Sequence, residues 1–449
     1  MSPEGNDSLT GPPAFPSWPK RLLLAARALS PGSAGPEWLL TLVDQGLVSA
    51  TTFLAGIIIG RTCGKEQFGL YLLGVSIIGL IMELQNVVIW SPYTVLSHRL
   101  TGSAQALYAG STLIHQLGFS VLGMLALAVT GFCLSWGIGL QELGAIVKML
   151  AVVGGFLFFR EYARRICFAG LKMKAALALD SGAMVVQLGG LLWLAYLGKL
   201  SAFRAFGVMG LGCALAGLSW FIWARKGLGF SFTQAVSDLG RNWSFGKWIL
   251  GGNMSEYVAL QLLYPWFLAA LQGTAAVGML AACQAVVALA NPFLQGSRNF
   301  LGPKAAQAFA QGGVGELRKF VVKSTLLLAP VIGLFYAAII IFGNNLVIFF
   351  YGSQYGGQSI FIAILALNAF IYALPLVVDC GIWAMGRPDL NLMIDSAILV
   401  VSLTLGFWLV NTFGLLGVGL GLLASTLMAF VVRGLILTRL SHSHTGPTI

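Results

Sequence analysis

The first apolar stretch of the chain, residues 37–71, is long enough to cross a bilayer and turn back. Its apolar run exceeds the ~20 residues that a transmembrane helix needs, yet it contains Asp44 and Gln45. An ionised carboxylate near the bilayer centre costs on the order of 2.5–3.5 kcal/mol. We therefore expect Asp44 to face protein or water. The short turn at 64–69 leads into a second membrane helix.

The same pattern recurs along the 449 residues, of which 57% are hydrophobic and 9% charged. Soluble domains carry about 25% charged residues, so we predict an all-α polytopic membrane protein with about twelve transmembrane helices. The net charge of +11 does not indicate nucleic-acid binding, because the basic residues lie in short loops between apolar runs. The expected spans are 38–60, 67–91, 106–136, 143–168, 175–197, 203–224, 245–271, 274–297, 320–343, 357–384, 390–413 and 414–438.

The distribution of basic residues predicts the orientation. With both termini inside, 21 of the 26 Lys and Arg residues fall on the inner side, which satisfies the positive-inside rule. We therefore expect a multi-pass protein of the cell inner (plasma) membrane with both termini cytoplasmic. Residues 1–36 are rich in Pro, Gly and Ser and are expected to be a disordered cytoplasmic segment, and 440–449 a cytoplasmic tail.

The two halves of the chain carry related features. Gly64 and Gly69 between the first two expected spans correspond to Gly273 and Gly278 between the seventh and eighth, and Asp180 corresponds to Asp395. Nearly constant offsets predict a parallel repeat of two six-helix bundles, a plan found in many secondary transporters. The bundles would span 37–224 and 245–439, joined by a cytoplasmic linker at 225–244.

Polar residues are concentrated in spans 1 and 2 and in their repeat equivalents 7 and 8. Such groups could hydrogen-bond between packed helices, but their coincidence on equivalent spans favours a hydrated cavity between the halves. The substrate or cavity candidates are Gln45, Arg61, Asn86, Arg160, Arg164, Asn253, Tyr257, Gln261, Gln284, Asn291, Gln295 and Arg298, and the ion-coupling candidates are Asp44, Glu83 and Glu256.

Several other ionisable residues allow two readings. Arg160 and Arg164 share a helix face and could reach lipid headgroups or clamp a diphosphate. Asp379 could pair with Arg387, and His115 could be a buried hydrogen-bonding residue or a proton carrier. The chain lacks a phosphate-binding GxxxxGK[ST] loop and a recognisable catalytic or metal-binding motif. We therefore expect a protein that is not an enzyme and that has no cofactor beyond a coupling ion, H⁺ or Na⁺.

Four segments, at 44–71, 159–169, 291–293 and 350–355, carry a recognisable pattern. They resemble polysaccharide exporters of the multidrug/oligosaccharidyl-lipid/polysaccharide (MOP) exporter superfamily, which includes the O-antigen (Wzx-type) flippases. The resemblance implies a V-shaped, MATE-like pair of six-helix bundles around a central cavity. It also implies an inner-membrane flippase that moves undecaprenyl-diphosphate-linked oligosaccharide for O-antigen, capsule or exopolysaccharide assembly, by alternating access coupled to an ion gradient.

Other functions remain open at this point. A cation or drug antiporter of the same superfamily would use the acidic residues to bind cationic compounds, and a lipid II flippase is a further relative. A polysaccharide polymerase or ligase is disfavoured, because the outer loops of the second half carry no charge. The expected partners are the lipid-linked oligosaccharide and membrane lipids. We expect a monomer that could also contact polysaccharide polymerase machinery.

Overall fold

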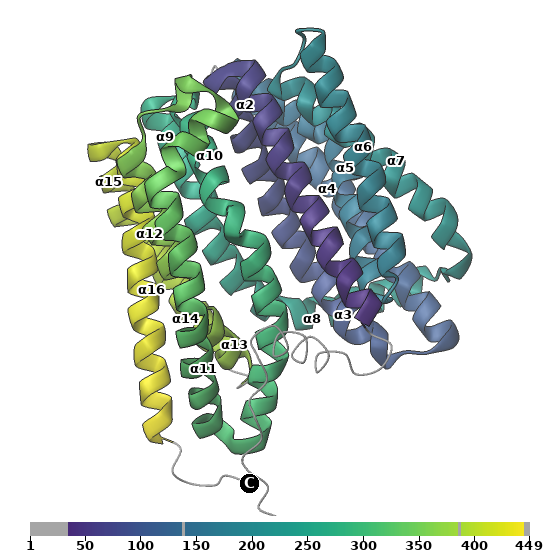
Figure 1. Cartoon of the computed structure of the whole chain (residues 1–449). Coiled ribbons are helices and arrows are strands. Elements are labelled where there is room, and N and C mark those ends of the chain that lie inside the picture. Colours follow the sequence, from purple (N-terminus) through teal and green to yellow (C-terminus); the bar gives the residue numbers. More distant parts are fainter. Residues whose placement is uncertain (1–34, 137–139, 385–387, 444–449) are drawn as a thin grey trace, which may run out of the picture.

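The computed structural model describes residues 35–136, 140–384 and 388–443, and these residues form helices in two side-by-side lobes (Figure 1). The expected disordered segment lies outside the described residues, except for its last two positions. The first lobe, here called the N-lobe, comprises α2 (Gly35–Gln85), η1 (Asn86–Trp90), α3 (Ser91–Leu96), η2 (Ser97–Arg99), α4 (Gly102–Trp136), α5 (Gln141–Ala169), α6 (Met173–Tyr196) and α7 (Ala202–Ala224).

The second lobe, the C-lobe, follows η3 (Arg225–Gly227). Its elements are α8 (Phe232–Tyr257), η4 (Val258–Leu262), α9 (Leu263–Gln272), α10 (Thr274–Val287), η5 (Ala288–Ala290), α11 (Asn291–Tyr351), η6 (Ser353–Tyr355), α12 (Ser359–Ala373), α13 (Leu376–Ala384), α14 (Pro388–Val401), η7 (Ser402–Gly406), α15 (Phe407–Phe413) and α16 (Leu415–Ser443).

The predicted all-helical membrane fold is confirmed. Ten stretches of described residues are long and apolar enough to cross a membrane. The first of them, Leu39–Arg99, bends at Gly64 and therefore contains two crossings. The seventh expected span, 245–271, is divided among α8, the π-helical η4 and α9. The structure thus accounts for about twelve crossings.

The two longest segments between expected spans, 225–244 and 298–319, were expected to be loops and are largely helical. Residues 232–244 form the first half of α8, and 298–319 belong to α11, which departs from helical geometry at Gly312 and Gly313. Both segments have side chains to bury. Leu301 and Leu317 of α11 pack in an apolar cluster with α13 residues such as Val377. Tertiary packing therefore supports helices where the charge content suggested loops.

Equivalent glycines shape the two corresponding turns. Gly64 and Gly273 have almost identical backbone angles, φ 81° and ψ 173° against φ 82° and ψ 175°. This left-handed region is available to glycine at little steric cost. The match agrees with the repeat inferred from the sequence. We call the end of the molecule that carries these turns the hairpin end.

The lobes join closely at the hairpin end. A Cβ at Gly69 would lie 1.9 Å from the carbonyl oxygen of Thr274, and one at Gly278 would lie 2.0 Å from that of Lys65. Only glycine allows these backbone approaches, which run in both directions between α2 and α10.

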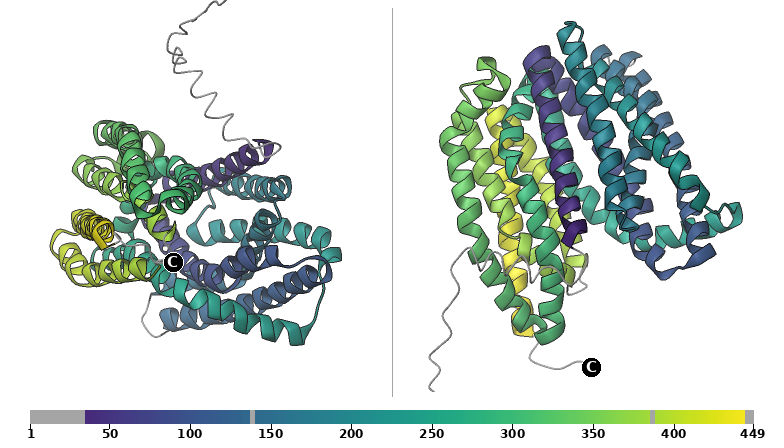
Figure 2. Two further views of the ribbon diagram at one scale, coloured as in Figure 1. Left: turned by 90° about the horizontal axis from the view of Figure 1, so that it is seen from below. Right: turned by 45° about the vertical axis from the view of Figure 1, so that its right-hand side comes forward.

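Aromatic side chains pack next to this glycine joint. Phe68 of the N-lobe stacks on Tyr351 of the C-lobe at a centroid distance of 5.5 Å. The Tyr355 hydroxyl donates a 3.0 Å hydrogen bond to the carbonyl of Gly60. Towards the opposite end the helices of the two lobes diverge (Figures 1 and 2). The lobes are therefore held together at the hairpin end.

We predict that Gly69→Ala destabilises the joint between the lobes. The added methyl must displace backbone, and overpacking of this kind costs about 1–3 kcal/mol. Gly118→Ala on the exposed face of α4 is the matched control, because its Cβ would meet nothing within 4 Å. Thermal unfolding of the purified protein should show a lower Tm for Gly69→Ala only, and equal Tm values would contradict the close contact.

Candidate substrate cavity and buried ion pairs

A cavity of about 730 Å³ lies in the C-lobe. Its walls come from α8, η4, α10, α11, α12, α13, α14 and α16, and Glu83 at the end of α2 adds one residue of the N-lobe. This volume is typical of binding sites for small molecules. The cavity therefore borders the space between the lobes but is built mainly by one of them.

Nine of the fifteen residues singled out from the sequence line this cavity. Gln284 of α10 and Asn291 and Gln295 of α11 share a wall because α10, η5 and α11 follow one another as a helical run, so their spacing of seven and four places them on one face. The nine residues are Glu83, Asn253, Glu256, Tyr257, Gln261, Gln284, Asn291, Gln295 and Arg298.

Seven carboxamide side chains face the cavity without a hydrogen-bond partner among the described residues. They are Asn253, Gln261, Gln284, Asn291, Gln295, Asn368 and Asn391. Some amides of the N-lobe side differ in this respect: Gln85 donates to Gln116 at 2.7 Å, and Asn242 accepts from Tyr108 at 2.8 Å. Gln261, Asn291 and Gln295 are exposed on the cavity wall, and the other four are half-buried or buried. Each amide offers both donors and an acceptor, so the hydrogen-bonding capacity of this wall is open to water or to a ligand.

Carboxylates outnumber cations around the cavity. Glu83, Glu256, Asp379 and Asp395 line it together with Arg298 and Arg433. The Nε atom of Arg433 lies 2.7 Å from Asp379, and its terminal nitrogen lies 3.7 Å from Asp395. The Tyr372 hydroxyl donates a 2.8 Å hydrogen bond to Glu256. With all six groups charged, the lining is net negative and favours neutral or cationic ligand groups.

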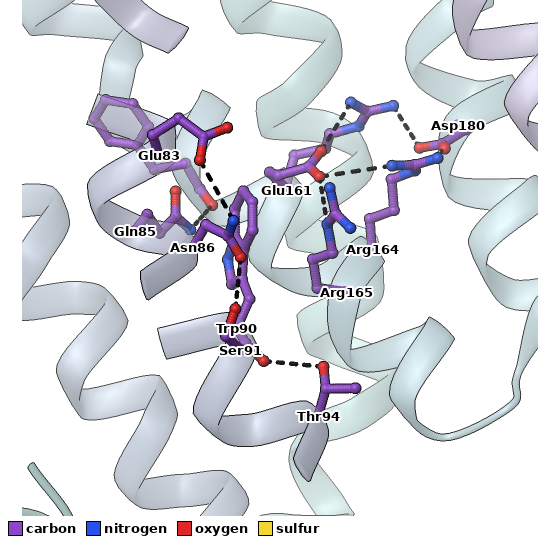
Figure 3. Close-up of polar contacts among 12 residues, drawn as sticks. Glu83, Gln85, Asn86, Trp90, Ser91, Thr94, Glu161, Arg164, Arg165 and Asp180 are labelled. Atoms are coloured by element: carbon purple, nitrogen blue, oxygen red, sulfur yellow. Dashed lines mark hydrogen bonds and ion pairs between the residues drawn. The ribbon is translucent and has the colours of Figure 1, made fainter. Parts of the chain in front are cut away.

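The N-lobe buries a different kind of polar cluster. Arg164 of α5 joins two acidic residues, with its terminal nitrogen 2.9 Å from Asp44 of α2 and its Nε 2.6 Å from Asp180 of α6. Arg160 also bonds to Asp180. Glu161 lies 3.6 Å from Arg164 and 2.9 Å from Arg165 (Figure 3). Three arginines thus balance three carboxylates.

The structure therefore separates candidates that the sequence suggested would share one cavity. Asp44, Arg160 and Arg164 belong to the N-lobe cluster, where the guanidinium groups already bind carboxylates. This arrangement differs from an open diphosphate clamp. The physical reason is that a charge inside a membrane protein needs an opposite charge close by.

The remaining candidates, Asn86, Gln45 and Arg61, neither line the cavity nor join the N-lobe ion pairs. Asn86 hydrogen-bonds to Glu83 and Ser91 at 3.4 and 3.0 Å (Figure 3). Gln45 is half-buried in α2, one residue after Asp44, and Arg61 is exposed three residues before the Gly64 bend.

The structure gives partners to two residues, His115 and Asp379, for which the sequence left two interpretations open. The Nε2 atom of His115 hydrogen-bonds to the Ala235 carbonyl at 2.8 Å, as in the structural reading. Asp379 pairs with Arg433, and Arg387, the partner suggested by the sequence, lies outside the described residues.

Sequence reasoning missed several lining residues. Asn368, Tyr372 and Asn391 line the cavity, and so does Arg433. Their signal was present as polar residues inside or next to apolar runs, but they fall on spans 10 to 12, outside the four spans that were emphasised.

Comparisons with known proteins identify the fold. No family model and no curated protein matches the chain. An inward-facing multidrug resistance MATE family transporter of the MOP superfamily superposes with a TM-score of 0.73 at 14% identity, over 89% of this chain and 96% of that one. An outward-facing conformation of a multidrug resistance MATE family transporter superposes with a TM-score of 0.62 at 12% identity, over 90% of this chain and 95% of that one.

A further structural relative is a MOP superfamily transporter from Pyrococcus furiosus, described as having a binding pocket of reverse polarity that suggests a different function. It matches at a TM-score of 0.62 and 11% identity, over 90% of this chain and 96% of that one. At such identities the similarity shows the fold alone. The chain is a multi-pass membrane protein with the two-lobe architecture of MATE transporters.

We predict that Asp180→Asn strongly destabilises the N-lobe. The substitution leaves Arg160 and Arg164 short of negative charge, and breaking a buried pair costs about 3–5 kcal/mol. Glu316→Gln is the control, since its pair with Lys319 at 2.7 Å lies on an exposed surface and should contribute little. Thermal unfolding should give a large drop in Tm for Asp180→Asn and almost none for Glu316→Gln, whereas similar values would argue against a structural cluster.

Proposed function

We propose that this protein is an alternating-access membrane exporter whose C-lobe cavity binds the hydroxyl-rich head of its substrate, with a lipid-linked oligosaccharide for surface polysaccharide assembly as the cargo. The observation that supports this most directly is the set of seven unpaired amides, with Tyr257, Tyr336 and Tyr372 beside them. Carboxamides offer donors and acceptors together, which suits the hydroxyl groups of a sugar.

Energetics favour a polar cargo over an apolar one. An amide that loses its water and finds no partner costs about 1–3 kcal/mol. A flat apolar compound filling the cavity would incur this cost at several of the seven amides, while a sugar would replace the lost water contacts with its own hydroxyls. The lipid tail of the cargo would remain in the bilayer beside the lobes.

The conformation fits the loading of a cytoplasmic substrate. The hairpin end is closed by the glycine joint and by Tyr355, and the superposition is better on the inward-facing relative than on the outward-facing one. Under the positive-inside orientation, the diverging end faces the cytoplasm. A lipid-linked cargo made at the inner leaflet would enter from that side.

Arg298 supports a role in binding the diphosphate. It lines the cavity and forms no ion pair with a described carboxylate, whereas Arg160, Arg164 and Arg433 each bind at least one. A guanidinium group is well suited to a phosphate. Of the arginines suggested from the sequence, Arg298 is thus the best placed beside the amides.

The excess of carboxylates supports an ion-coupled cycle and keeps a second function under consideration. Glu256 faces the cavity and is held by Tyr372, so H⁺ or Na⁺ binding at its carboxylate would change the charge next to the cargo. The same acidic lining would attract organic cations. A cation or drug antiporter is therefore the second candidate.

We predict that Gln284→Leu and Asn291→Leu each reduce transport without lowering the amount of protein in the membrane. The matched control is Gln307→Leu, an exposed amide of α11 outside the cavity. In a deletion strain carrying each variant, surface polysaccharide should fall and lipid-linked oligosaccharide should accumulate for the two cavity variants only. Full polysaccharide in both would remove the amides from cargo binding.

We also predict that Glu256→Gln abolishes transport and that Tyr372→Phe weakens it, because the first removes the negative charge and the second only the hydrogen bond to it. Surface polysaccharide and susceptibility to cationic drugs should be measured in the same strains. Loss of polysaccharide with unchanged drug susceptibility supports the flippase. Normal polysaccharide with increased susceptibility would overturn it in favour of the antiporter.

A further inference from the structure

The first half of α8, residues 232–244, has three distinct faces. Phe232, Val236, Leu239 and Trp243 are spaced by four, three and four positions, which places them on one stripe of the helix, and they are 75%, 60%, 43% and 48% exposed. Exposed apolar side chains in a continuous row are unusual on a surface that faces water.

A second face carries only small or polar residues. Thr233, Ser237, Gly240 and Ser244 are all exposed, and they form a stripe about 100° around the helix from the apolar one, because each member follows a member of that stripe by one residue. The segment is therefore amphipathic with both of these faces open.

The third face fixes the segment to the N-lobe. Ala235, Asp238 and Asn242 are almost completely buried. Asn242 accepts the hydrogen bond from Tyr108 of α4, and the Ala235 carbonyl accepts one from His115. Because α4 holds this third face, the directions of the other two are set by the protein.

The apolar stripe continues a surface that faces lipid. Ile222 and Trp223 at the end of the membrane helix α7 are 63% and 58% exposed, and Phe230, between α7 and α8, is 58% exposed. The backbone N–H of Gly229 binds the Ala106 carbonyl of α4 at 3.0 Å and holds this connection on the lobe. In the view from below, α8 runs along one edge of the molecule from the N-lobe to the C-lobe (Figure 2).

We propose that residues 232–244 form an interfacial helix that docks on the bilayer surface, with the 232/236/239/243 stripe among the upper acyl chains and the 233/237/240/244 stripe in water. An apolar face beside a polar face is what the headgroup boundary accommodates. The docking relies on apolar contact, because Arg241 is engaged with Asp238 at 2.8 Å and with the Tyr108 ring at 5.1 Å.

The test compares adjacent positions on the two open faces. Cys63 and Cys133, the accessible cysteines among those described, are first changed to Ser. Val236→Cys and Ser237→Cys are then introduced one at a time into the full chain. Each protein is labelled with bimane and reconstituted into phosphatidylcholine vesicles. Quenching is measured with an acyl-chain nitroxide lipid and with aqueous iodide. Leu218→Cys on the exposed face of α7 provides the reference for lipid contact.

The expected result is strong lipid quenching at 236, close to that at 218, and strong iodide quenching at 237. Equal quenching at 236 and 237 by either agent would overturn the proposal. So would weak quenching of 236 by both agents, which would show that protein covers the stripe. If Val236→Cys fails to fold, Leu239→Cys tests the same stripe with the same criteria. None of these outcomes depends on which cargo the cavity carries.

Discussion

A polar side chain inside a membrane protein must have either a partner or water, and the two lobes satisfy this requirement in opposite ways. The N-lobe pairs its buried charges with one another, and Arg164 joins Asp44 and Asp180 across three helices. The C-lobe leaves seven amides unpaired around one cavity. The first solution ties three helices of the N-lobe together, and the second leaves hydrogen-bonding groups that water or a ligand can complete.

The repeat between the lobes preserves the positions of two buried aspartates but not those of the arginines that pair with them. Asp180 and Asp395 occupy corresponding positions, and each lies near a buried arginine. In the N-lobe the partners Arg160 and Arg164 come from α5, whereas in the C-lobe Arg433 comes from α16 and approaches Asp395 only to 3.7 Å. The looser arrangement leaves Asp395 on the cavity wall. The two halves thus share a plan but pair their equivalent aspartates differently.

The sequence predicted what depends on local pattern. Apolar runs indicated the crossings, Gly64 and Gly273 the equivalent turns, and the spacing of Gln284 and Asn291 the cavity wall. It could not predict pairings between distant residues, such as Asp44 with Arg164. The first half of α8 was missed for a related reason: its buried face carries Asp238 and Asn242, whose partners lie on other turns or helices, so the segment has the polar composition of a loop.

The glycine joint at the hairpin end has a consequence for how the lobes could separate. Its closest contacts are backbone against backbone, at Gly69 with Thr274 and at Gly278 with Lys65. At these two contacts no side chain lies between the helices, so separating them requires no rotamer change there. The neighbouring Phe68–Tyr351 stack and the Tyr355–Gly60 hydrogen bond are the side-chain contacts that separation of the lobes would have to break.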